Sequence, residues 1–119
     1  MGGCQDRSTE EDTQHDMIPV RIRDLAEADI EKARIRYARE DERLGIRFTH
    51  ELSTIVDRIG ALPDQFPEVG KSVRRALLQR FPYAAYFVRR QDIAVVIAVL
   101  HQHQRPGGWK PRAKLEQAG

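Results

Sequence analysis

The sequence predicts an α+β fold in which a helical hairpin packs on one face of a four-stranded, mainly antiparallel sheet. Three patterns predict it: a short segment of alternating apolar residues, two helical stripes of apolar residues, and three consecutive strand-like segments. In chain order they give β-α-α-β-β-β. The helices would cover one face of the sheet, and the opposite face and the edges would be left for function.

The chain of 119 residues has the length of a single domain with one core. We expect a disordered acidic N-terminal extension over 1–16, a folded domain over 17–112 and a polar C-terminal tail over 113–119. Met17 directly precedes the first patterned element and is an alternative start. Because Cys4 is the only cysteine, no disulfide can form within the chain. No apolar run approaches the roughly 20 residues that span a bilayer, and no signal-peptide core is present, so we expect a cytoplasmic protein.

The first strand and the first helix follow one another directly. Residues 18–23 alternate apolar side chains with proline or arginine, which is the period of a half-buried strand. Pro19 has no N–H to donate, so this strand lies at an edge of the sheet or Pro19 lies at its start. Asp24 is expected to be the N-cap of the helix, with Glu27 as its capping-box partner. The helix carries a narrow apolar stripe, formed by Ala26, Ile30, Ala33 and Tyr37.

A second helix carries a stronger stripe, and together the two helices form an αα-hairpin. Apolar residues recur along it at spacings of four and three, at Phe48, Leu52, Ile55, Ile59 and Leu62. The run 40–43 and Gly45 are expected to form the turn between the helices. Pro63 ends the second helix, because proline disfavours helical backbone at the residue before it. The arginines Arg34, Arg36 and Arg39 are expected to lie on the solvated face of the first helix.

Three strands are expected in the second half of the chain. The first covers Val73–Phe81 and the second covers Tyr83–Arg89, with Pro82 between them. The third, Ile93–Leu100, consists of eight consecutive apolar residues and is therefore a central strand covered on both faces. The short connections, such as the turn at 90–92, favour an antiparallel meander.

The net charge of +2 conceals an uneven distribution of charge along the chain. Residues 1–16 hold five acids and one arginine, and residues 17–70 hold nine bases and eleven acids. Residues 71–119 hold ten bases and two acids, an excess of eight positive charges. Such a concentration is typical of a surface that binds a polyanion or an acidic protein segment.

Several segments carry a resemblance through their order and spacing. They are Leu44–Phe48, Leu62–Pro67, Val73–Tyr83 and Val99–His101, with Pro106 and Trp109 downstream. Together they resemble the RelE/ParE superfamily of toxins from bacterial type II toxin–antitoxin systems, over about residues 18–112. The β-α-α-β-β-β order agrees with the fold of that superfamily.

The resemblance implies a growth-inhibiting toxin of the plasmid-stabilisation type, neutralised by a cognate acidic antitoxin that folds on the toxin. The excess of positive charge fits such a partner independently. It implies no cofactor, no metal, no membrane partner, and no sequence-specific DNA binding without the antitoxin. The residues expected to bind antitoxin or target are Arg74, Arg75, Arg80, Tyr83, Tyr86, Arg89, Arg90, Arg105 and Trp109.

The superfamily divides by target, which leaves enzyme activity open. ParE-like members inhibit DNA gyrase, whereas RelE-like members cleave ribosome-bound mRNA. RNA cleavage by a 2′-OH needs a base, an acid and cations that stabilise the phosphate charge. In that alternative Arg80 would supply a cation, and His101 and His103 would supply the proton-transfer pair, since residues two apart on a strand share a face. In the simpler interpretation the arginines are solvated and His101 hydrogen-bonds the backbone.

The segment after the last strand favours the ParE-like interpretation. RelE-like enzymes place a functional aromatic or basic residue there, whereas the run 101–109 is closer to the tails of ParE-like members. We therefore expect an inhibitor of DNA gyrase, with a ribosome-dependent mRNA endoribonuclease as the alternative. A second alternative is a non-toxic regulatory module with the toxin fold.

Three further features have two interpretations each. Tyr83, Tyr86 and Phe87 either stack on bases or belong to the core, and strand alternation places Tyr83 and Phe87 on one face and Tyr86 on the other. Trp109 is either an exposed anchor or closes one end of the core. His101 with the histidine two residues later would begin a metal site only with a third ligand, which no suitable spacing supplies.

Overall fold

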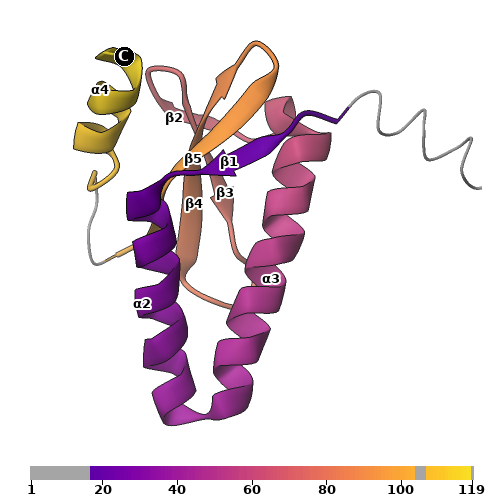
Figure 1. Ribbon diagram of the computed structural model, residues 1–119, viewed down its shortest axis with the longest axis vertical. Coiled ribbons are helices and arrows are strands. Elements are labelled where there is room, and N and C mark those ends of the chain that lie inside the picture. Colours follow the sequence, from indigo (N-terminus) through magenta and orange to yellow (C-terminus); the bar gives the residue numbers. More distant parts are fainter. Residues whose placement is uncertain (1–16, 104–106, 119) are drawn as a thin grey trace, which may run out of the picture.

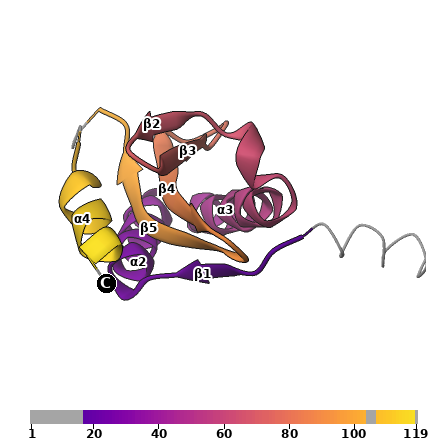
Figure 2. The ribbon, with the colours of Figure 1, turned by 90° about the horizontal axis from the view of Figure 1, so that it is seen from above.

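The computed structural model describes residues 17–103 and 107–118. A five-stranded sheet lies between a hairpin of two long helices and one short C-terminal helix (Figures 1 and 2). The elements are β1 (Val20–Ile22), α2 (Asp24–Glu40), α3 (Glu42–Ala61), the 3-10 turn η1 (Pro63–Gln65), β2 (Glu68–Gly70), β3 (Val73–Leu77), β4 (Tyr83–Arg90), β5 (Ile93–His101) and α4 (Lys110–Ala118).

The sheet has the strand order β1-β5-β4-β3-β2. β1 is parallel to β5, and the other neighbours are antiparallel. The predicted α+β class and the packed helical hairpin are therefore confirmed, but the expected four strands are wrong, because β2 adds a fifth. β2 has only three residues, too few to show a strand period in the sequence. β3 ends at Leu77 rather than at Phe81, which packs in the core beyond the strand.

The hairpin turn is shorter than the sequence suggests, and the cap expected for α2 is wrong. Asp24 was expected to cap α2, but it is the first helical residue and Arg23 precedes it without a side-chain cap. Asp41 alone separates the two helices, and its carboxylate accepts a hydrogen bond of 2.9 Å from the backbone N–H of Arg43. Gly45 was expected in the turn and lies inside α3. A Cβ there would be 3.0 Å from the Cβ of Ala38, so glycine allows the two helices to approach closely.

The larger core lies between the hairpin and one face of the sheet. Phe48 and Ile59 of α3 and Phe87 of β4 are fully buried there. Tyr83 faces the same core, whereas Tyr86 points to the opposite face, as strand alternation predicts. The aromatic rings of Tyr37, Phe48, Phe81 and Tyr83 contact one another at centroid distances between 4.8 and 6.1 Å.

A smaller core lies on the opposite face of the sheet, which was expected to be open. Helix α4 packs there, with Ala113 buried in a cluster that includes Val95 and Ile97, and the half-buried Trp109, just before the helix, packs against the same cluster. The expectation of an open sheet face is therefore wrong, and the segment expected as a polar tail is helical as far as Ala118. The expected acidic extension, 1–16, lies outside the described residues. Among the described helices, none is long and apolar enough to cross a membrane.

Candidate functional site

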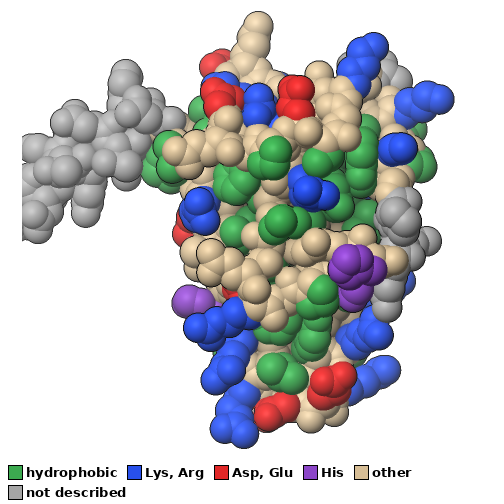
Figure 3. All heavy atoms as spheres, turned by 180° about the vertical axis from the view of Figure 1, so that it is seen from behind, with side chains coloured by type: hydrophobic (Ala, Val, Ile, Leu, Met, Phe, Trp, Pro, Cys, Tyr) green, Lys and Arg blue, Asp and Glu red, His purple; other side chains and the backbone are tan. Residues whose placement is uncertain are grey.

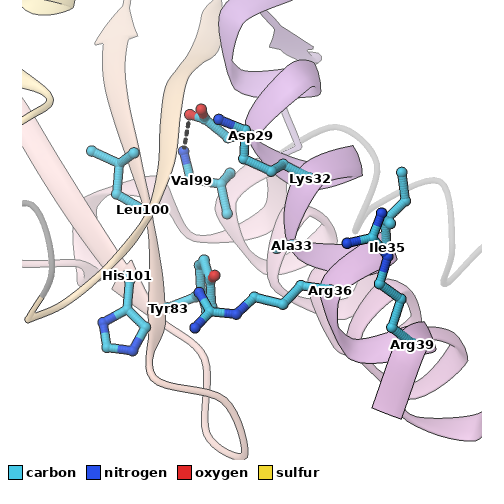
Figure 4. Close-up of a pocket in the computed structure, with 10 residues that line it drawn as sticks. All are labelled: Asp29, Lys32, Ala33, Ile35, Arg36, Arg39, Tyr83, Val99, Leu100 and His101. Atoms are coloured by element: carbon cyan, nitrogen blue, oxygen red, sulfur yellow. Dashed lines mark hydrogen bonds between the residues drawn. The ribbon is translucent and has the colours of Figure 1, made fainter. Parts of the chain in front are cut away.

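A groove of about 710 Å³ runs between α2 and the C-terminal half of β5 (Figure 4). Helix α2 supplies one wall and β5 the other, with Tyr83 from β4 at one end. The lining residues are Asp29, Lys32, Ala33, Ile35, Arg36, Arg39, Tyr83, Val99, Leu100 and His101. The groove therefore combines cationic, apolar and hydrogen-bonding groups from three separate elements.

Its helical wall is positively charged. Lys32, Arg36 and Arg39 lie four and three residues apart, which places them on one side of α2. None of the three forms an ion pair with an acid that the structure describes. The Arg36 side chain extends across the groove toward Tyr83 and His101 (Figure 4). More widely, basic side chains lie along both flanks of the hairpin end of the molecule (Figure 3).

A carboxylate closes one end of the groove. Asp29 accepts a hydrogen bond of 3.0 Å from the backbone N–H of Val99 and a second of 3.2 Å from the Arg112 guanidinium. Arg112 also donates to the carbonyl of Ile97 at 3.1 Å. Because both side chains of this pair are largely buried, they fix α2, β5 and α4 to one another.

At the other end the two predicted histidines meet. The backbone N–H of His103 donates to Nδ1 of His101 at 3.1 Å, so a neutral His101 ring carries its proton on Nε2. The ring of His101 lies 5.3 Å from that of Tyr83 and 5.9 Å from that of His103. Burial raises the pKa of the neighbouring Tyr37, and Tyr83 raises it further. This corner therefore holds proton-transfer groups beside the Arg36 guanidinium.

Arg80, the cation predicted for RNA cleavage, lies in another place. It lines a hollow of about 470 Å³ along α3, together with Arg47, His50 and Arg58. Its backbone N–H donates to the Glu51 carboxylate at 3.1 Å. Arg80 and His101 therefore line different hollows.

Three of the predicted binding arginines take part in contacts within the chain. Arg74 donates to the backbone carbonyl of Phe66 at 2.6 Å and so holds the segment before β2. Arg89 pairs with Asp64 at 2.9 Å. Arg90 pairs with Glu116 of α4 at 3.4 Å. These contacts give Arg74, Arg89 and Arg90 structural roles in addition to any role in binding.

The remaining predicted residues on this side also contribute to packing. The ring of Tyr86 stacks on Trp109 with a centroid distance of 5.8 Å and an interplanar angle of 18°. Trp109 also covers Gly70, where a Cβ would lie 2.4 Å from the indole. Trp109 therefore closes the smaller core, one of its two predicted roles. The Nε of Arg75 is buried without a hydrogen-bond partner, and Arg105 lies outside the described residues.

Polar contacts, rather than apolar burial, attach most of α4. Arg23 donates to both carboxylate oxygens of Glu116, at 2.9 and 2.7 Å. These hydrogen bonds lower the pKa of Glu116 and raise that of Arg23. Gln117 donates to the carbonyl of Lys71 at 2.9 Å. Leu115, by contrast, is 71% exposed.

The cationic wall was not expected from the sequence, in which Arg36 and Arg39 have the pattern of a solvated helix face. The same side of α2 also carries Asp29 and Lys32, at positions neighbouring the buried Ala26 and Ala33. Charged residues at the border of an apolar stripe lie where the helix meets the sheet, and this position could have indicated the groove. Within the described residues, no cluster of three His, Cys, Asp or Glu side chains could hold a metal ion.

Comparisons with known proteins identify the fold. No protein-family model matches the sequence, and no curated protein matches it. A solved structure described as the chromosomal ParDE TA system from P. aeruginosa matches with a TM-score of 0.64 and 17% identity. The match covers 71% of this chain and 96% of that one. The chain therefore has the ParE-like toxin fold, in agreement with the resemblance seen in its sequence.

Proposed function

We propose that this protein is the toxin of a type II toxin–antitoxin module, acts in the cytoplasm and inhibits DNA gyrase in the manner of ParE-like members. The observation that supports it most is the fold match to the ParDE structure, which extends over nearly the whole of the matched chain. The excess of positive charge in residues 71–119 supports an acidic antitoxin as the partner.

The placement of the predicted catalytic residues favours gyrase inhibition over mRNA cleavage. Cleavage requires the cation and the proton-transfer groups around one phosphate. Arg80 and His101 line different hollows, and this placement supports docking rather than cleavage. An inhibitor that acts by docking needs only an exposed surface, and the basic flanks of the molecule provide one (Figure 3).

Controlled expression in a bacterial host tests the proposal. We expect growth arrest, filamentation and induction of a DNA-damage reporter, while ribosome-bound mRNA stays intact in primer-extension assays. Purified protein should inhibit supercoiling by purified gyrase. Growth arrest with cleaved mRNA would instead support the endoribonuclease, and the absence of any growth effect would support the regulatory module.

Two further experiments separate the alternatives. Replacing His101 and His103 by alanine should abolish toxicity if the protein is the predicted nuclease and leave supercoiling inhibition largely intact if it is a gyrase inhibitor. Circular dichroism and thermal unfolding must show that the double variant folds. Co-expression of the protein encoded by the adjacent reading frame should restore growth if that frame encodes the antitoxin.

A further inference from the structure

We propose that the acidic N-terminal segment, residues 1–16, binds the hollow along α3 of its own chain and covers the cations there. The proposal goes beyond the inhibition of gyrase and does not depend on it. It combines a cationic hollow, the opposite charge of the segment, and the place where the segment joins the described structure.

The hollow of about 470 Å³ lies between one side of α3 and the loop after β3. Arg47, His50 and Arg58 recur on that side of the helix, and Arg80 comes from the loop. The three arginines are exposed, and none of them pairs with an acid in the described part of the chain. The hollow therefore presents three guanidinium groups to solvent.

The acid that lines the hollow is already engaged. The Glu51 carboxylate accepts hydrogen bonds from the backbone N–H groups of Gln79 and Arg80, the second at 3.1 Å. It therefore holds the loop against α3. The guanidinium of Arg58 lies 5.7 Å from the centroid of the Phe66 ring, a contact that leaves its charge unneutralised. The excess of positive charge favours an anionic occupant.

The N-terminal segment carries the opposite charge and joins the fold beside this hollow. Residues 1–16 hold five acids and one arginine, and three of the acids are consecutive at 10–12. The backbone N–H of Ile18 donates to the carbonyl of Gly60 at 3.0 Å, so β1 begins at the C-terminal end of α3 (Figure 1). Because Arg58 lies only two residues before Gly60, the acids are tethered close to the hollow.

The dimensions allow the acids to reach the whole hollow. At a rise of about 1.5 Å per residue, Arg47 lies about 20 Å from Gly60 along α3. An extended chain advances about 3.3 Å per residue, so the run 10–12 can lie roughly 20–26 Å from Ile18. Tethering gives the segment an effective concentration on the order of 1 mM, whereas a nucleic acid must bind from solution. Weak pairing of exposed charges is therefore favoured within the chain.

The cationic wall of α2 is farther from the segment. β1 carries the chain about 20 Å from Ile18 to Asp24, at about 3.3 Å per residue, before α2 begins. Lys32, the first cation of that wall, lies about 12 Å farther along the helix. The hollow along α3 is therefore the first cationic surface that the segment meets.

A nitroxide on Cys4 tests the contact in the full chain. Cys4 is the only cysteine, so the label is attached at one place in the segment. At about 0.01 M salt we expect paramagnetic broadening of the amide signals of Arg47, His50 and Arg80. At about 1 M salt, which screens charges beyond about 3 Å, the broadening should disappear. Broadening that does not reach the hollow, or that persists at high salt, would overturn the proposal.

A mixed sample shows whether the contact is made within one chain. It contains isotope-labelled protein without nitroxide and unlabelled protein with nitroxide. We expect no broadening at the hollow in this sample. Broadening as strong as in the singly labelled chain would show that the segment binds a second copy and would contradict the proposal.

Two charge-reversed variants locate the site. Arg47→Glu with Arg80→Glu should reduce the broadening at the hollow several-fold. The matched control, Arg36→Glu with Arg39→Glu, makes the same change in net charge at exposed positions that line the other groove, and it should leave this broadening unchanged. Thermal unfolding must show that both variants fold. Equal losses in the two would mean attraction to the net charge alone and would contradict the proposal.

Binding of labelled oligothymidylate, measured by fluorescence anisotropy at low salt, tests whether the segment covers the hollow. The triple variant Glu10→Gln, Glu11→Gln, Asp12→Asn should bind it several-fold more tightly than the parent does. Adding Arg47→Glu and Arg80→Glu to both proteins should remove the difference. Equal affinity of the parent and the triple variant would show a hollow open to nucleic acid, and a difference that survives the arginine changes would place the effect elsewhere. Either result would overturn the proposal.

Discussion

The two faces of the sheet are covered by different kinds of interaction. On the hairpin face, large side chains such as Phe48 and Ile59 are fully buried. On the α4 face, Ala113 is buried, and it alone among the α4 side chains whose burial the structure describes; ion pairs of Arg112 and Glu116 provide much of the attachment. Burial of large apolar side chains contributes more to stability than ion pairs with partly solvated partners, such as those of Arg23 and Arg90 with Glu116. The hairpin is therefore the scaffold, and α4 is the cover that is easier to detach.

The largest expected effect is on the hairpin face. Phe48→Ala removes a ring that is fully buried between Tyr37, Phe81 and Tyr83. We expect the free energy of unfolding to fall by about 3–5 kcal/mol, measured by urea denaturation. A loss below about 1 kcal/mol would show that this face is not the dominant core.

A smaller effect is expected where Trp109 covers β2. Gly70→Ala places a Cβ 2.4 Å from the indole, so the ring must move, and we expect a loss of about 1–3 kcal/mol. Trp109 is the only tryptophan, so its fluorescence should shift to longer wavelength as it becomes more exposed. The control is Gly45→Ala, where the new Cβ meets Ala38 at 3.0 Å inside the hairpin. Gly45→Ala should lower stability without changing the Trp109 fluorescence. A fluorescence shift in both variants would show that the two faces of the sheet do not respond separately.

Removing the charge of Glu116 should affect α4 alone. Glu116→Gln weakens the ion pairs with Arg23 and Arg90, and we expect a loss of about 1 kcal/mol or less. Amide exchange should accelerate within α4 and remain unchanged in α2 and α3. Faster exchange throughout the hairpin would mean that α4 is part of the scaffold.

Lowering the pH should also loosen α4, because it protonates the Glu116 carboxylate gradually. The pKa of Glu116 is lowered in the folded protein, chiefly by the hydrogen bond from Arg23, so its contribution is complete above the ordinary value of 4.5. The contribution is lost as the pH falls below 4.5 and through the lowered folded-state pKa. Trp109 fluorescence should respond over that range before the helical circular dichroism falls. In Glu116→Gln this early response should be absent.

The sequence predicts the elements whose pattern of apolar residues is visible within the element itself. The apolar stripe of α3 and the apolar run of β5 have clear periods, and both elements are where they were expected. Helix α4 depends instead on contacts such as Arg23 with Glu116, which are 93 residues apart in the chain. No local pattern reveals such a pair, so the segment resembles a polar tail in the sequence.

The candidate groove was unpredictable for a related reason. Lys32, Arg36 and Arg39 have the composition of an ordinary solvated helix face. Their setting depends on where β1 stops pairing with β5, which is a property of the assembled sheet. The rings of the two histidines lie 5.9 Å apart, but His103 is in the turn after β5 and not on the strand, where it was expected.

The parallel pairing of β1 with β5 has a consequence for the order of folding. Val20 meets Ala94, so the first strand of the domain pairs with the last. The hairpin of α2 and α3, joined by Asp41 alone, can form from neighbouring sequence while the rest of the chain is still being synthesised. β1 has no partner until β5 has left the ribosome. The domain, and with it the groove beside β5, is therefore completed only when nearly the whole chain has been made.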